Sequence, residues 1–137
     1  MIVFLVIPNF TSSTQTYARE SEQVTYIKPT QDDVVGLITH YALKYDIDPK
    51  IPLAVGKAES GYKNVPNFKY DGEGGRYTAY GIFQFTRTTW KGFCTPDPVD
   101  RMDIEKNVEC GVRMMSEGHI KHWNESKHMW ITKIGHM

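Results

Sequence analysis

The clearest pattern in the chain is an apolar stripe with the spacing of an α-helix that starts near residue 30. Thr30 stands three positions before Asp33, an arrangement close to the capping box, in which a hydroxyl and an acidic side chain satisfy the first backbone amides of a helix. The stripe predicts a helix that faces the core and ends near Asp46. Its apolar members are Val34, Leu37, Ile38, Tyr41, Ala42 and Tyr45.

A second apolar run predicts another packed helix, which we expect to start at Asp48-Pro49 and to carry Glu59 in its last turn. Pro52 lacks a backbone donor, so the regular helix is expected to begin as much as one turn later. Gly61 follows Glu59 closely and favours a helix end there. The apolar members of this run are Ile51, Leu53, Ala54, Val55 and Ala58.

Two further helices are predicted in the C-terminal half of the chain. Thr86 is the expected N-cap of a short helix that runs through Trp90, and Asp103 is the expected N-cap of a longer one. A turn at Thr95–Pro98 separates them. The longer helix presents one apolar face, which is made of Ile104, Val108, Gly111, Val112 and Met115.

Between Gly61 and Tyr80, glycine, proline, asparagine and aspartate interrupt the pattern and predict a loop or a short hairpin. Asp71 and Glu73 lie in this stretch, but it lacks the regular series of oxygen ligands that a calcium loop requires. The following Tyr80-Gly-Ile-Phe-Gln84 has a glycine that lets a ligand approach the backbone and a glutamine that offers a donor and an acceptor. These residues fit equally well a buried, strand-like piece in which Gln84 satisfies a neighbouring backbone group.

The first ten residues are apolar but too few to span a bilayer as a helix, and we expect no integral membrane domain. We interpret residues 1–18 as a signal peptide, with its cleavage site near Thr16 and Ala18. Residues 19–29 are then a linker before one domain over residues 30–137. A buried N-terminal strand is the alternative, because no Lys or Arg precedes the apolar run.

The charge balance of the chain argues against a partner that is held by charge alone. The 137 residues hold 16 basic and 16 acidic side chains, so no net charge favours nucleic acid or an anionic membrane surface. The length fits a single domain with its own core, and we expect a monomer. His119, His122, His128 and His136 gather near the C-terminus, but the ligand spacing of a tetrahedral zinc site is missing. We therefore expect neither a metal nor another cofactor.

Cys94 and Cys110 are the two cysteines of the chain. In an exported protein such a pair most simply forms a disulfide, which here ties the loop after Trp90 to the following helix. In a cytoplasmic protein the two residues would instead be free, buried thiols. The pairing therefore depends on the interpretation of the N-terminus as an export signal.

The candidate chemistry centres on Glu59. A carboxylate in the last turn of a packed helix meets the negative end of the helix dipole and an apolar wall, and both disfavour its ionised form. A carboxyl group that stays protonated near neutral pH is suited to general-acid cleavage of a glycosidic bond.

Three segments form a recognisable set: Ala54-Val-Gly-Lys-Ala-Glu-Ser-Gly61, Ala79-Tyr-Gly-Ile-Phe-Gln84 and Asn107-x-x-x-Gly111. Together they resemble the SLT-type lytic transglycosylases of the goose-type lysozyme-like superfamily. The resemblance extends over most of the chain, from about Pro29 to Trp130. It implies a mainly α, lysozyme-like fold, that is, a compact helical domain with the glycine-rich loop or short hairpin beside a sugar cleft.

The resemblance also implies a function on peptidoglycan glycan strands, in the periplasm, the cell envelope or outside the cell. Glu59 would protonate the glycosidic oxygen between N-acetylmuramic acid and N-acetylglucosamine. It would then take the proton of the muramic acid 6-hydroxyl, which gives a 1,6-anhydro product. The residues expected to contact the sugar are Ser60, Thr78, Tyr80, Gly81, Gln84, Trp123 and Asn124.

The chain departs from the family pattern in two places. Trp123-Asn-Glu-Ser126 stands where the family has Ala-Tyr-Asn, whose tyrosine contacts the catalytic glutamate. An indole donates a hydrogen bond but cannot accept one, so Tyr80 is a candidate replacement. The family's serine before Gly-x-x-Gln has no clear counterpart, and Thr78 is the nearest hydroxyl.

Two alternatives to a transglycosylase follow from the sequence. One is a hydrolytic lysozyme, in which Asp71 or Glu73 activates a water molecule on the opposite face of the sugar ring. The other is a non-catalytic peptidoglycan-binding module with a decayed site, which the tryptophan at position 123 brings into consideration.

Overall fold

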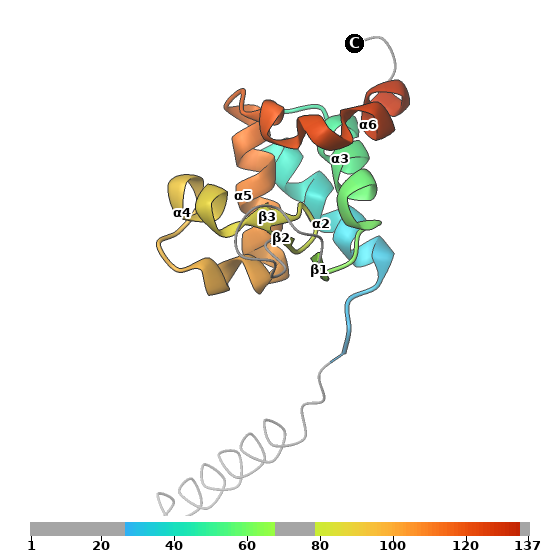
Figure 1. Cartoon of the computed structure of the whole chain (residues 1–137). Coiled ribbons are helices and arrows are strands. Elements are labelled where there is room, and N and C mark those ends of the chain that lie inside the picture. The colour runs from blue at the N-terminus through green and yellow to red at the C-terminus, as the bar shows by residue number, and fades with distance from the viewer. Residues whose placement is uncertain (1–26, 68–78, 135–137) are drawn as a thin grey trace, which may run out of the picture.

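The computed structural model describes residues 27–67 and 79–134, and in this part the chain folds mainly into helices, as predicted (Figure 1). The expected signal peptide over residues 1–18 lies outside the described residues. No described helix is both long enough and apolar enough to cross a membrane. The elements are α2 (Gln31–Lys44), α3 (Lys50–Ser60), β1 (Pro66–Asn67), β2 (Ala79–Tyr80), β3 (Phe85–Thr86), α4 (Arg87–Phe93), η1 (Pro98–Met102), α5 (Ile104–Ser116), η2 (Ile120–Ser126) and α6 (Lys127–Ile134), where η marks a 3₁₀-helix.

Helix α2 begins with the predicted capping box. The hydroxyl of Thr30 accepts a hydrogen bond from the backbone amide of Asp33 (3.2 Å), and the carboxylate of Asp33 accepts one from the amide of Thr30 (2.8 Å). The helix ends at Lys44, slightly before the expected end, because Asp46 takes a left-handed conformation with φ of 55°. Its buried face consists of Val34, Ile38, Tyr41 and Ala42.

Helix α3 starts at Lys50, whose backbone amide donates to the side chain of Asp48 (3.0 Å). This start lies one residue after Pro49, within the predicted range. Pro52 causes no further delay, because it falls in the first turn, where backbone amides have no partner within the helix. The helix ends as predicted at Gly61, which takes the left-handed conformation with φ of 63°. Glu59 therefore lies in the last turn.

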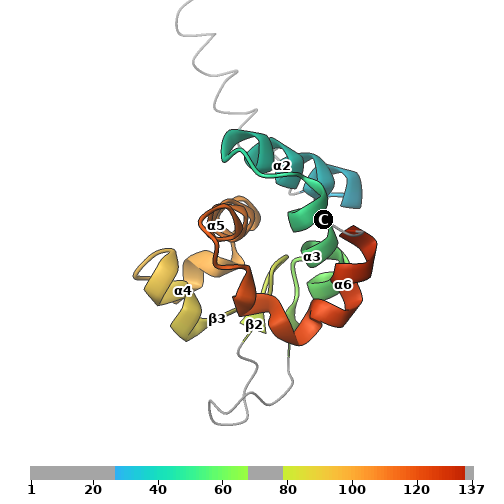
Figure 2. The same ribbon diagram turned by 90° about the horizontal axis from the view of Figure 1, so that it is seen from above.

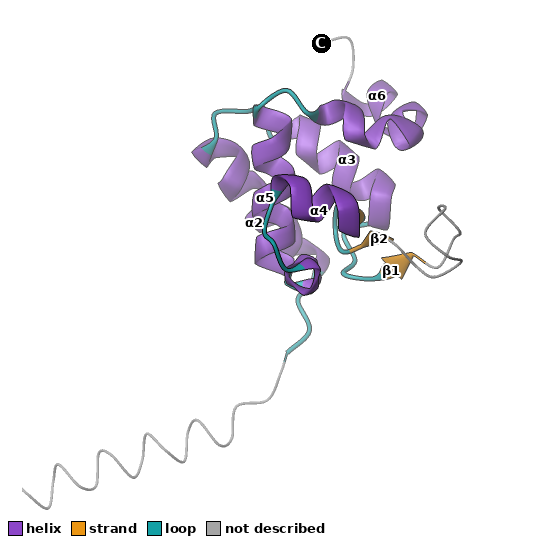
Figure 3. Cartoon of the chain, turned by 60° about the vertical axis from the view of Figure 1, so that its left-hand side comes forward, coloured by secondary structure: helices purple, strands orange, loops and turns teal. Residues whose placement is uncertain are grey.

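The segment after α3 forms the edge of a small antiparallel sheet in the order β1-β2-β3. Pro66 pairs with Tyr80, and Tyr80 pairs with Phe85. The predicted hairpin is thus present where β1 and β2 meet, as Figure 3 shows. Asp71, Glu73 and Thr78 belong to residues 68–78, which lie outside the described part.

Helix α5 begins at its predicted cap, Asp103, and runs through the middle of the domain between α2 and the strands. Seen from above, α4 lies on one side of it, and α6 lies beside α3 on the other (Figure 2). Gly111 of α5 packs against the ring of Phe83, so closely that a Cβ atom at this position would lie 2.3 Å from a ring carbon. The glycine therefore sets how near α5 comes to the strands.

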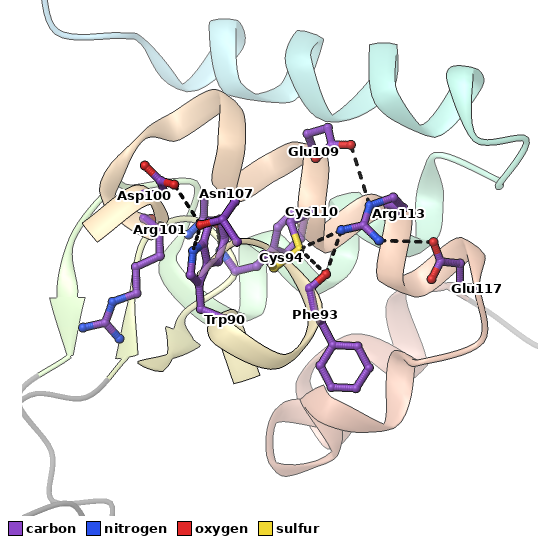
Figure 4. Close-up of a disulfide and its surroundings, with 12 residues drawn as sticks. Trp90, Phe93, Cys94, Asp100, Arg101, Asn107, Glu109, Cys110, Arg113 and Glu117 are labelled. Carbon is purple, nitrogen blue, oxygen red and sulfur yellow. Dashed lines mark hydrogen bonds and ion pairs between the residues drawn. A yellow bond between two sulfur atoms is a disulfide. The ribbon is translucent and has the colours of Figure 1, made fainter. Parts of the chain in front are cut away.

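The predicted disulfide is present. Cys94 at the end of α4 is bonded to Cys110 in the middle of α5, with 5.8 Å between the Cα atoms (Figure 4). Helix α4 continues to Phe93, beyond the expected end at Trp90. Arg113 adds a second link here, because its guanidinium donates to the carbonyl of Phe93 (2.8 Å). The C-terminal end of α4 is thus held to α5 by a covalent bond and a hydrogen bond.

Two of the four C-terminal histidines pack beside the disulfide. The rings of His119 and His122 lie 5.0 and 4.8 Å from the ring of Phe93. Burial, with the neighbouring His119 and Lys121, lowers the pKa of His122. His128 is exposed at the start of α6.

Candidate active site

Glu59 lies one residue before the end of α3, and its side chain is half-buried. Burial of the carboxyl group raises its pKa above the ordinary value of 4.5, and the negative charge of Glu125 acts in the same direction. A hydrogen bond from Ser126 acts in the opposite direction, because it favours the carboxylate. Since the net pKa is raised, more of Glu59 is protonated near neutral pH than in an exposed glutamate, which is the state that a general acid requires.

The hydroxyl that contacts Glu59 belongs to Ser126, at the end of η2. The same hydroxyl also lies 3.1 Å from the carbonyl oxygen of Trp123 and 3.2 Å from the indole nitrogen of Trp130. Tyr80 was the candidate for this contact from the sequence, and Ser126 was not predicted. The available clue was a hydroxyl residue three positions after Trp123, in the segment that replaces the family's Ala-Tyr-Asn.

Trp123 is a core residue whose ring is only 5% exposed. Its indole N–H donates to the carbonyl oxygen of Phe83 (2.8 Å), and its ring packs against Phe83 and Phe85 at centroid distances of 6.0 and 5.7 Å. The indole therefore holds the chain between β2 and β3 from one side. The following residue, Asn124, is exposed.

The turn from Gly81 to Gln84 connects β2 with β3, and both end residues are left-handed, with φ of 89° and 53°. The side-chain nitrogen of Gln84 donates to the carbonyl oxygens of Val65 (2.8 Å) and Gly81 (2.9 Å). Both amide hydrogens are thus used within the fold, as one of the two sequence interpretations held. The side-chain oxygen has no partner among the described residues, so Gln84 offers a ligand an acceptor and not a donor.

Asn107 of α5 holds this turn from the core side, and it is fully buried. Its amide nitrogen donates to the carbonyl oxygens of Tyr80 (3.1 Å) and Arg101 (2.8 Å), and its oxygen accepts from the amide of Phe83 (3.0 Å). A Cβ atom on Gly81 would lie 2.1 Å from the Asn107 nitrogen. Glycine at position 81 is therefore required for both the backbone conformation and the close approach of Asn107.

Ser60 connects the two halves of the site, because its hydroxyl donates to the carbonyl oxygen of Ile82 (2.9 Å) in the Gly81–Gln84 turn. The end of α3, which carries Glu59, is thus joined to the Gly81–Gln84 turn through Ser60 and Ile82. Tyr80 instead lines a cavity of about 470 Å³ between the starts of α2 and α5, together with Tyr62.

The comparison with protein families agrees with the mainly helical fold. Residues 36–132 match the family model of the transglycosylase SLT domain. Because this match covers more than half of the 137 residues, the chain belongs to that family, and its fold is lysozyme-like. Searches of the curated proteins and of the solved structures gave no match.

Proposed function

We propose that the protein is a peptidoglycan lytic transglycosylase in which Glu59 is the general acid and base. The observation that carries this proposal is the state of the Glu59 carboxyl group: it is half-buried, its pKa is raised, and it lies at a helix end joined to the Gly81–Gln84 turn through Ser60. Family membership supports a glycosidic bond as the target of such an acid.

The proposed reaction needs one carboxyl group. Protonated Glu59 gives its proton to the oxygen that links N-acetylmuramic acid to the next N-acetylglucosamine, and the bond from this oxygen to the muramic C1 breaks. The carboxylate then takes the proton of the muramic 6-hydroxyl group, and the oxygen of that hydroxyl group forms a bond to C1. The product is a 1,6-anhydromuramic end, and Glu59 is protonated again. Proximity favours this internal nucleophile over water once the sugar is bound.

The Gly81–Gln84 turn is proposed to orient the sugar. The side-chain oxygen of Gln84 has no partner in the part of the chain that the structure describes, so it would accept a hydrogen bond from a hydroxyl or from the N–H of an acetamido group. Ser60 uses its hydroxyl on Ile82, so we assign it to positioning the turn and not to sugar contact.

We further propose that the protein acts as a monomer outside the cytoplasm, in the periplasm, the cell envelope or the medium. Peptidoglycan lies there, and a disulfide such as Cys94–Cys110 persists in oxidising compartments.

The test is to compare wild type with Glu59→Gln on purified glycan strands and to identify the products by mass spectrometry. Glutamine has nearly the same shape but no proton to give, so we expect the rate to fall by about 10²–10⁴. Glu125→Gln is the matched control, since it removes a neighbouring exposed carboxylate, and it should keep most of the activity. Wild-type activity in Glu59→Gln would remove Glu59 from the mechanism.

The products separate the transglycosylase from the lysozyme. Transglycosylase products carry 1,6-anhydromuramic ends and lack one water relative to hydrolytic ends. Reducing ends, together with a loss on Asp71→Asn, Glu73→Gln or Glu125→Gln as large as that of Glu59→Gln, would mean that a second carboxylate activates water.

A further inference from the structure

The hydroxyl of Ser126 has three polar neighbours that differ in what they can do. The indole nitrogen of Trp130, at 3.2 Å, can only donate, and the carbonyl oxygen of Trp123, at 3.1 Å, can only accept. The third neighbour, the carboxyl group of Glu59, accepts when ionised and donates when protonated. A serine hydroxyl has a single proton, so it cannot donate to Trp123 and to an ionised Glu59 at the same time.

We infer that Ser126 is a positioning residue whose single proton changes partner with the protonation state of Glu59, an inference that rests on the proposed function. When Glu59 is ionised, Ser126 donates to it. The indole N–H of Trp130, which lies 3.3 Å from the carbonyl oxygen of Trp123, then donates a hydrogen bond to that oxygen. When Glu59 is protonated, its O–H donates to the Ser126 oxygen, and the serine proton turns to the Trp123 carbonyl. In both states every polar atom of the network has a partner.

In the proposed reaction Glu59 loses a proton in the first step and regains one in the second. The change of hydrogen-bond partner gives Glu59 a suitable partner in both states. Ser126 neither gains nor loses a proton over the cycle, and no bond to its oxygen forms or breaks. It only rotates its hydroxyl. A partner that could only donate would favour the carboxylate and weaken the acid, whereas a partner that could only accept would weaken the base.

Burial makes the network depend on Ser126. Trp123 and Trp130 are only 5% and 3% exposed, so the side of the serine that faces them is closed off from solvent. Without the hydroxyl, the carboxyl group of Glu59 would lose a partner in a half-buried place, where an unmet hydrogen bond is costly.

The charged and titratable groups on the elements around Glu59 are few. Glu125 on η2 is the one whose charge acts on the pKa of Glu59, and it raises it. Lys127 and His128 start α6, Lys57 lies two residues before Glu59 on α3, and Tyr80 ends β2. Glu125 is therefore the group whose effect must be separated from that of Ser126.

The arrangement differs from the tyrosine of the resembled family. Here the hydroxyl comes from a residue three positions later, and the same stretch of chain supplies its donor and its acceptor. Trp123, Ser126 and Trp130 stand at positions i, i+3 and i+7 across η2 and α6. The whole relay is therefore built from one continuous segment that packs on α3.

The inference is tested with Ser126→Ala and the conservative control Ser126→Thr, which keeps the hydroxyl. We expect Ser126→Ala to lower kcat on soluble glycan strands on the order of tenfold to a hundredfold, with KM nearly unchanged. The pKa of Glu59 should rise, so the alkaline limb of the pH profile should move to higher pH. A carbon-13 NMR titration of the Glu59 carboxyl group measures the same shift without activity. Ser126→Thr should restore both properties, and Glu125→Gln should move the pKa in the opposite direction.

Trp130→Phe serves as a second variant, and it applies even where Ser126→Ala does not fold. It removes the N–H donor and keeps most of the ring, so the pKa of Glu59 should rise by less than in Ser126→Ala. The inference is overturned if folded Ser126→Ala has the kcat and the Glu59 pKa of wild type. It is also overturned if Trp130→Phe does not raise the pKa of Glu59 and Ser126→Thr does not restore it. Failure of the proposed function is recognised separately, because Glu59→Gln would then keep its activity whatever Ser126 does.

Discussion

The Gly81–Gln84 turn and the carboxyl group of Glu59 are held by different kinds of contact. The turn is fixed by buried contacts that leave no spare room, from Asn107 on one side and the indole of Trp123 on the other. Glu59 is held by one hydroxyl that can rotate. The part that orients a substrate is thus rigid, whereas the part that exchanges protons keeps one adjustable partner.

Because the turn is tightly packed, we expect an added methyl group there to lower the free energy of unfolding strongly. Gly81 and Gly118 have almost the same backbone conformation, with φ of 89° and 88°, but a Cβ atom meets Asn107 at 2.1 Å in the first case and open space in the second. Gly118→Ala should cost about 1–2 kcal/mol for the backbone conformation alone. Gly81→Ala should cost about 2–5 kcal/mol, because overpacking adds to that cost. Urea unfolding of both variants measures the difference, and equal losses would show that Asn107 gives way freely.

We expect the next largest loss of stability on removing the disulfide, which closes a loop that carries both Arg101 and Asn107. The two cysteines are 16 positions apart, and the chain-entropy model gives about 3 kcal/mol for a loop of that size. Cys94→Ser with Cys110→Ser should lower the free energy of unfolding by this amount. Adding a reductant should destabilise wild type equally and leave the double variant unchanged. A wild type insensitive to reductant would contradict this role.

Gln84→Met tests the hydrogen bonds within the turn with a side chain of similar length. It removes the donors to Val65 and Gly81, and we expect the free energy of unfolding to fall by about 1–2 kcal/mol. The acceptor oxygen is also lost, so glycan binding measured by calorimetry should weaken. If binding weakens while stability stays the same, the two backbone bonds contribute nothing to the turn.

Glu59→Gln should give the smallest change in the free energy of unfolding. This change should be a gain at neutral pH, whereas the substitutions in the Gly81–Gln84 turn should cause losses. The pKa of Glu59 is raised above 4.5 by burial, so the unfolded chain ionises more readily than the folded one. Wild type therefore loses stability as the pH rises above about 4.5, whereas the amide does not ionise. The variant should be more stable than wild type at pH 7, and the gain should vanish at pH 3. Thermal unfolding at both pH values measures this, and an equal gain at both would exclude ionisation as its cause.

The features that the sequence predicted correctly are those determined by near neighbours. The caps at Thr30 and Asp103 and the helix end at Gly61 depend on residues within a few positions, so a pattern in the sequence is enough. Gly81 was interpreted from the sequence as room for a ligand, whereas the group that approaches it in the structure is the side chain of Asn107.

The partner of Glu59 could not be predicted in this way. Ser126 lies 67 positions from Glu59, and their contact depends on how η2 and α6 pack against α3. For Gln84 the sequence offered two interpretations and could not choose between them, because the choice depends on the carbonyl oxygen of Val65, 19 positions away. A glycine can mark a crowded place in the sequence, but the sequence does not identify the residue that contacts a glycine, a hydroxyl or an amide.

The hydrogen bond from Ser60 to Ile82 has one more consequence, for ligand design. It joins the end of α3 to the Gly81–Gln84 turn, so the position of the turn at this helix end is fixed before a ligand binds. If Glu59 and Gln84 have the roles proposed above, a molecule with a cation for the carboxylate and an N–H donor for Gln84 would meet groups on two segments that are already joined. Such a ligand binds without the entropic cost of ordering the protein, so most of its contact energy would appear as affinity.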